Sequence, residues 1–149
     1  RWGFRTIRNL SGHMVEPYIV HAGFSIPNIW IPGTQELKAG QVYAIEPFLT
    51  FQSGAGLVVE SETRNIYSLI TRRKTDDRHL DEFVEHIWSR FRTLPFTSRY
   101  FPETTPAMLN VMLDKLIQLK VLRSYPVLVE AKGKPVAQAE HTILSLAMK

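Results

Sequence analysis

The sequence of 149 residues contains no cysteine. Disulfide scaffolds, thiolate zinc sites and cysteine nucleophiles are therefore excluded, because each of them needs a thiol sulfur. Any metal ion bound by this chain must be held by histidine, aspartate or glutamate side chains. A chain without cysteine also suits a reducing compartment, so we expect a cytoplasmic protein.

Long hydrophobic runs are also missing. No apolar segment reaches the roughly 18 to 20 residues that a membrane helix needs, and the N-terminus lacks the pattern of a signal peptide. The composition, 44% hydrophobic and 21% charged, is typical of a soluble chain that forms a core. We therefore expect a soluble, intracellular domain with no membrane partner.

Positive charge is present but thinly spread. The net charge is +4, and the basic residues gather in residues 1–8 and 72–74. A groove for nucleic acid usually needs a denser basic patch with interleaved aromatic residues, so the sequence does not favour a nucleic-acid partner. The first residue is arginine rather than methionine, which indicates a piece of a longer chain.

Residues 41–51 are almost unbrokenly apolar, which predicts one strand buried on both faces. Glu46 interrupts this run, and a buried carboxylate is costly unless it is paired, hydrogen-bonded or bound to a metal. The same problem arises with His13 and His21 between two glycines, and with Glu140 in the last apolar segment. Each of these residues taken alone is more often structural than catalytic.

The other strands are predicted from short apolar runs between turn residues. We expect an irregular segment from Gly12 to Pro17 and a loop over residues 25–32. We also expect a strand at 18–21 and a hairpin turning at 53–56. A strand at 127–130, a turn at 132–134 and a last strand at 136–148 are predicted to form a closing hairpin.

Two helices are predicted between these strands. Apolar residues recur at three- and four-residue steps from Leu80 to Phe91, with Thr75 or Asp76 as the N-cap. The second helix starts at Pro106 and is capped by Thr105. Residues 72–122 therefore form a helical unit inserted among strands.

Two sets of residues could hold a metal ion. His79, Glu82 and His86 fall on one side of the first helix, opposite its apolar stripe, where a solvated polar face explains them better. His13, Glu46 and Glu140 could supply one imidazole and two carboxylates to an open hydrolytic site. Alternation in the last strand places Gln138, Glu140 and Thr142 on one face.

Six short blocks of the sequence carry a resemblance to a known family. The blocks are Gly12-His13, His21-Ala22-Gly23, Tyr43-Ala44-Ile45-Glu46-Pro47-Phe48, Leu94-Pro95-Phe96, Tyr125-Pro126 and Glu140-His141-Thr142-Ile143. In this order they resemble the C-terminal half of type II methionine aminopeptidases, especially the archaeal ones. The related prolidases and aminopeptidases P resemble the chain less, because they lack the His-Ala-Gly block together with the helical insertion.

The resemblance implies an α+β fold, namely half of the pita-bread fold of creatinases and aminopeptidases, built mainly from antiparallel strands. Residues 1–71 and 123–149 would form the C-terminal half of that catalytic domain. Residues 72–122 would form the helical insertion typical of the type II enzymes.

The resemblance also implies the site and the reaction. The enzyme would use two divalent ions (Co, Mn, Fe or Zn) to hydrolyse the initiator methionine from nascent proteins. Glu46 would move the proton and His21 would contact the substrate and stabilise the tetrahedral intermediate. The metal ligands would be His13, Glu46 and Glu140, and the walls of the methionine pocket would be Val20, Phe48, Ile66 and Tyr125.

One departure limits what this chain can do. The family's paired aspartate ligands lie upstream, and the aspartates here (Asp76, Asp77, Asp81 and Asp114) all fall in the helical segment. We therefore expect the 149-residue segment to need the missing N-terminal half and to be inactive alone. Two alternatives remain: a non-catalytic relative that binds ribosomes or other proteins, and a different peptidase of the same fold.

Overall fold

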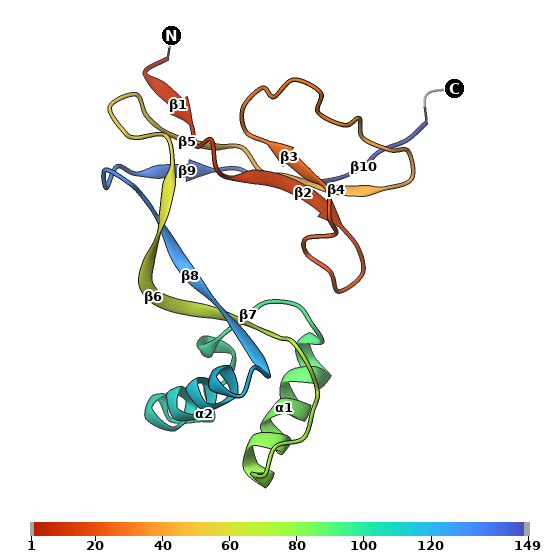
Figure 1. Cartoon of the computed structure of the whole chain (residues 1–149), viewed down its shortest axis with the longest axis vertical. Helices are drawn as coiled ribbons and strands as arrows, with labels where there is room; N and C mark the ends of the chain where they lie inside the picture. The colour runs from red at the N-terminus through yellow and green to blue at the C-terminus, as the bar shows by residue number, and fades with distance from the viewer. Residues whose placement is uncertain (1, 148–149) are drawn as a thin grey trace. The chain divides into compact units, whose positions relative to one another are not determined.

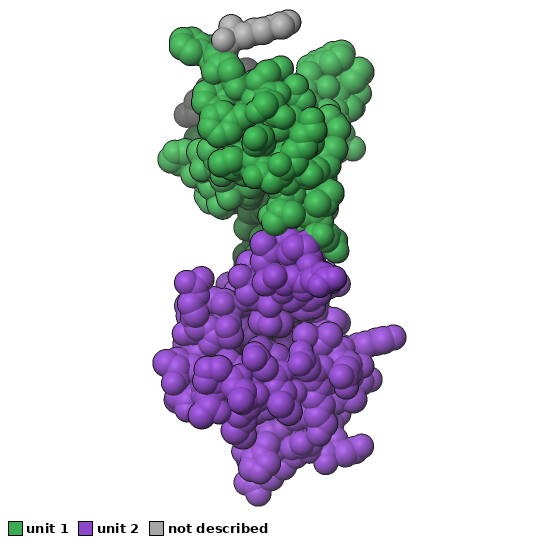
Figure 2. Space-filling view, turned by 90° about the vertical axis from the view of Figure 1, so that its left-hand side faces the viewer, with its two compact units in different colours: residues 1–60, 128–149 green, residues 61–127 purple. Residues whose placement is uncertain are grey.

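A computed structural model describes residues 2–147 of the chain (Figure 1). It divides into two compact units, residues 1–60 with 128–149 (unit 1) and residues 61–127 (unit 2), as coloured in Figure 2. Residues 1, 148 and 149, which belong to the predicted catalytic half, lie outside the described residues. The assignment of residues 72–122 as an insertion stays a prediction.

Antiparallel strands dominate unit 1, and two helices form much of unit 2 (Figure 1). In residues 2–147, no helix is long and apolar enough to cross a membrane. The elements are β1 (Phe4–Thr6), β2 (Ser11–Val15), β3 (Ser25–Pro27), β4 (Val42–Ile45), β5 (Phe48–Phe51), β6 (Val58–Leu69), α1 (Arg78–Phe91), β7 (Phe96–Thr97), the 3-10 helix η1 (Ser98–Tyr100), α2 (Pro106–Gln118), β8 (Leu122–Glu130), β9 (Val136–Gln138) and β10 (His141–Leu144).

The predicted single strand over residues 41–51 is wrong, because the chain breaks at Glu46 and Pro47 into β4 and β5. These two strands belong to different sheets, with the orders β10-β4-β2-β3 and β1-β5-β9. Pro47 has no N–H to donate, so the ladder loses a hydrogen bond there. The run is not buried on both faces either, since Leu49 and Phe51 are exposed.

The predicted closing hairpin is also wrong, because β8 and β9 lie in different sheets. Its last strand, predicted over residues 136–148, breaks into β9 and β10, which lie in different sheets as well. The break between β9 and β10 lies opposite the break between β4 and β5, because His141 pairs with Ile45 and Gln138 pairs with Phe48. The register is therefore the same on both sides of the gap. It places Glu140 directly across from Glu46.

Two hydrogen bonds show which kind of pair Glu46 and Glu140 make. The N–H of Ala139 donates to the oxygen of Pro47 (3.2 Å), and the N–H of Ser145 donates to the oxygen of Gln41 (3.0 Å). Hydrogen-bonded pairs alternate with non-hydrogen-bonded pairs along an antiparallel ladder. The two glutamates therefore occupy a non-hydrogen-bonded position, where side chains come closest.

The segment before them also differs from the prediction. Gly12 and His13, expected in an irregular segment, lie in β2, and the first part of the predicted loop over residues 25–32 forms β3, which pairs with β2. The predicted strand at 18–21 is wrong: Glu16 and Ile19 close a tight turn through two backbone hydrogen bonds. Tyr18 takes a positive φ of 62° there, a conformation that no strand residue adopts.

The hairpin predicted at residues 53–56 does not form, because β5 pairs with β1 and β9 and not with β6. The loop is held instead by the buried carboxylate of Glu130, which accepts backbone N–H groups from Ala55 and Gly56 and from Lys132 and Lys134. Burial raises the pKa of Glu130, but these four donors outweigh it, so that its pKa is lowered.

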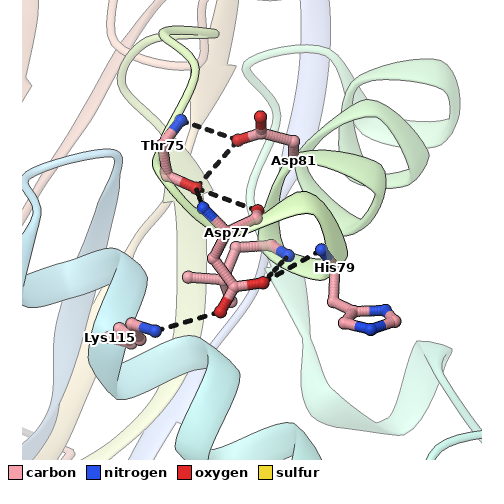
Figure 3. Close-up of polar contacts among 6 residues, drawn as sticks. Thr75, Asp77, His79, Asp81 and Lys115 are labelled. Atoms are coloured by element: carbon pink, nitrogen blue, oxygen red, sulfur yellow. Dashed lines mark hydrogen bonds and ion pairs between the residues drawn. The ribbon is translucent and has the colours of Figure 1, made fainter.

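Helix α1 of unit 2 begins one residue later than expected. Asp77, rather than Thr75 or Asp76, is the N-cap and accepts from the N–H groups of His79 and Leu80 (Figure 3). Asp77 also accepts from Nζ of Lys115 on α2 at 3.0 Å, which ties the two helices of this unit together (Figure 3).

Helix α2 matches the prediction, with Thr105 as its N-cap and Pro106 as its first residue. The apolar faces of both helices pack into one core with the strand residues around them. The fully buried members include Ile87 from α1 and Leu116 from α2, both at 0% exposure. This core lies within unit 2.

Leu116→Ala is expected to lower the free energy of unfolding by about 2 to 5 kcal/mol, because it removes buried methyl groups and leaves a cavity. Urea unfolding followed by helical circular dichroism measures this change. Val111→Ala, on the exposed side of the same helix, is the control and is expected to change stability by less than about 0.5 kcal/mol. Equal effects of the two substitutions would contradict the packing described.

Candidate functional site

The strand pairing of unit 1 places the predicted site residues on one face. Partners in an antiparallel pair share a face, and so do residues two apart in a strand. His13 pairs with Ala44, which lies two residues before Glu46, and Glu46 lies across from Glu140.

His13 and Glu46 are in direct contact. Nε2 of His13 lies 2.9 Å from Oε1 of Glu46, with the two side chains only 7% and 14% exposed. Nδ1 of His13 lies 3.3 Å from the backbone oxygen of Met14, which fixes the ring. This contact depends on Gly12, because a Cβ there would lie 2.3 Å from the backbone oxygen of Ala44. Glycine therefore lets β2 approach β4 closely.

The electrostatics of Glu46 follow from this setting. Burial raises the pKa of Glu46; the nearby charge of His13 and its hydrogen bond lower it, and the negative charge of Glu140 raises it again. The balance leaves the pKa of Glu46 above its ordinary value. Glu140 therefore lies close enough to Glu46 for its charge to act on it.

His21 lies next to His13. Their ring centroids are 4.0 Å apart with an angle of 51° between the ring planes. Burial, and then the charge of His13, lower the pKa of His21 below its usual value. A neutral imidazole at the edge of the cluster can donate or accept a hydrogen bond.

The four predicted pocket residues fall in different parts of the chain. Val20 is half-buried after the turn at Glu16–Ile19, and Phe48 is half-buried at the start of β5, both in unit 1. Ile66 is exposed on β6, and Tyr125 on β8 has its hydroxyl 3.0 Å from Oγ of Ser68, both in unit 2. Their grouping into one pocket stays a prediction.

The histidines of α1 do not form a metal site. His79, Glu82 and His86 are exposed; Glu82 pairs with Arg78 at 2.8 Å, and the ring of His86 packs against Phe101 at 5.6 Å. The solvated-face interpretation of these residues is in keeping with these contacts.

The oxygen and imidazole donors of His13, Glu46 and Glu140 are of the kind that binds divalent ions. Across the described part of the chain, however, no three or more His, Asp or Glu side chains are grouped so that they could hold an ion. The assignment of His13, Glu46 and Glu140 as metal ligands therefore stays a prediction.

The chain is similar to methionine aminopeptidases of several archaea. The match is 39% identical to the methionine aminopeptidase of Saccharolobus solfataricus, over 95% of this chain and 48% of that protein. The enzymes of Thermococcus onnurineus and Methanocaldococcus jannaschii are 40% and 35% identical, each over 96% of this chain. The chain is a relative of the archaeal methionine aminopeptidases. It spans about half the length of the curated relatives it matches.

The methionine aminopeptidase relationship agrees with the fold. A thermophilic Arx1 structure aligns with a TM-score of 0.75 and 17% identity, over 95% of this chain and 38% of that one. This likeness and the antiparallel pairings confirm the predicted α+β pita-bread fold. A scan against protein-family models gave no match.

Sequence reasoning missed one contact of the site. Nε2 of Gln138 donates to Oε2 of Glu46 at 3.4 Å. Alternation along the sequence already predicted that Gln138 and Glu140 share a face. The sequence does not give the strand register, however, and without the register the contact between Gln138 and Glu46 could not be predicted.

The pKa of Glu46 is expected to respond in opposite directions to its two neighbours. Glu140→Gln removes a negative charge and lowers the pKa, whereas His13→Ala removes the stabilising partner and raises it. Carbon-13 NMR of the Glu46 carboxyl measures both, with Glu36→Gln as the unaffected control. Shifts of the same sign in both variants would contradict the arrangement.

The raised pKa also sets the direction of a stability change. The folded chain holds the Glu46 proton more tightly than the unfolded chain does. Its contribution to stability is complete below the unfolded pKa, and is lost as the pH rises through the folded pKa.

Proposed function

We propose that this chain is the C-terminal half of the catalytic domain of a methionine aminopeptidase, which removes the initiator methionine from nascent proteins in the cytoplasm. The observation that supports the proposal is the contact of His13 with Glu46, within reach of the charge of Glu140, in a chain 39% identical to such an enzyme.

Each residue of the cluster has a role in this proposal. Glu46, whose pKa is raised, is suited to take up and release a proton near the reacting amide. His21, whose pKa is lowered, lies beside His13 and would donate a hydrogen bond to the carbonyl oxygen of the substrate. Val20 and Phe48, both in unit 1, would contact the methionine side chain.

The second half of the domain is the partner that the proposal requires. Phe4, Leu49 and Phe51 form an exposed apolar patch on the sheet β1-β5-β9, beside a cavity of about 240 Å³. Apolar patches of this kind mark surfaces that another protein segment covers. The other half would cover this face and add the donors that complete a site for two divalent ions (Co, Mn, Fe or Zn).

Glu46→Ala and Glu140→Ala, made in a polypeptide that joins this chain to its other half, are each expected to lower kcat/KM by at least about a hundredfold. Release of methionine from a Met-Ala-Ser peptide measures the effect, and His79→Ala on α1 is the control. Near-normal turnover by either glutamate variant would reject these roles.

The 149-residue chain alone is expected to bind divalent ions weakly, because its ligand set is incomplete. Calorimetric titration with Co²⁺ or Mn²⁺ measures the affinity of the chain for these ions. His13→Ala is expected to reduce this affinity further. Tight uptake of two ions per chain would contradict the proposal.

A binding role without catalysis is the second candidate. The observation that favours it is the incomplete ligand set of the described residues. Such a protein would use the same fold to hold ribosomes or other proteins. Cleavage of the Met-Ala-Ser peptide by the joined polypeptide separates the two functions, since a binding module releases no methionine.

A further inference from the structure

The two carboxylate oxygens of Glu46 have different partners. Oε1 lies 2.9 Å from Nε2 of His13, and Oε2 accepts from the amide Nε2 of Gln138 at 3.4 Å. The terminal torsion of a glutamate side chain has a broad, roughly twofold profile, so a single partner leaves the carboxylate plane free to rotate. Two partners on opposite oxygens fix that plane.

The strand register makes the contact between Gln138 and Glu46 a consequence of the fold. Gln138 pairs with Phe48, two residues from Glu46, so it is the diagonal neighbour of Glu46 across the strands. A long side chain reaches a diagonal neighbour. The hydrogen bond from Ala139 to Pro47 holds the two strands together between them.

An amide suits this position chemically. It donates a hydrogen bond to Glu46 without adding charge, so the electrostatic balance between Glu46 and Glu140 is unchanged. A lysine would neutralise one of the two carboxylates, and a glutamate would add a third negative charge to the cluster.

We propose that Gln138 is a positioning residue that holds the carboxylate plane of Glu46 in its working orientation. The proposal rests on the proposed function, in which Glu46 moves the proton. Gln138 acts through Glu46, and its loss therefore slows the chemical step rather than weakening substrate binding.

Kinetics of the joined polypeptide test this role. Gln138→Met, which has nearly the same length and no donor, is expected to lower kcat about tenfold with KM changed less than twofold. Gln138→Asn keeps the amide and is expected to recover part of kcat. Thr142→Val, which changes a polar residue of the neighbouring strand β10, is the control and is expected to leave both parameters unchanged.

A change in KM with kcat preserved would overturn the proposal, because it would make Gln138 a wall of the substrate pocket. A loss no larger than that of Thr142→Val would overturn it too. If the joined polypeptide without substitutions releases no methionine, the proposed function fails, and the contact itself is then tested by NMR.

The NMR measurement follows the side-chain amide signal of Gln138, identified by its disappearance in Gln138→Met. This signal is expected to move in Glu46→Ala, which removes the acceptor, and to stay in place in Thr142→Val. A Gln138 amide signal that is unmoved by Glu46→Ala would show that the contact is absent and would overturn the proposal.

Discussion

In unit 1 the segment β4–β5 pairs antiparallel with the segment β9–β10. The pairing passes from one sheet into another without a change of register, and the rest of the site depends on this constraint. It sets Glu46 opposite Glu140 at a position where side chains come closest. Like charges opposite one another destabilise a sheet. His13 and Gln138 offset part of this repulsion by contacting Glu46. Burial, and then the charge of Glu140, nevertheless leave the pKa of Glu46 raised.

Small structural details make this approach possible. Gly12 allows β2 to lie against β4, so that His13 reaches Glu46. Pro47 interrupts the ladder beside Glu46, where the chain passes from one sheet to the other. Glu130 holds the loop that follows β5 and the turn that precedes β9 with one carboxylate. Backbone geometry, rather than side-chain chemistry alone, therefore assembles the cluster.

The sequence was sufficient where local signals act alone. Thr105 and Pro106 marked the start of α2, and the isolated acid Glu46 marked the site. The sequence was insufficient where strand pairing decides the structure. An apolar run has the same pattern whether its residues lie in one sheet or in two, and the run that contains Glu46 and Pro47 is of this kind. The turn through Tyr18 was also missed, since its positive φ follows from two backbone hydrogen bonds and not from composition.

The central claim is that Glu46 and Glu140 face one another across the strands. The chain has no cysteine, so a disulfide in the variant Glu46→Cys/Glu140→Cys reports this directly. Non-hydrogen-bonded pairs have Cα atoms about 4.5 Å apart, within the range that a disulfide spans. Mild oxidation is predicted to remove both thiols in this variant and to leave them in Glu46→Cys/Thr142→Cys, where the register is shifted by two residues. Free thiols persisting in the first variant, or equal oxidation of both, would contradict the account.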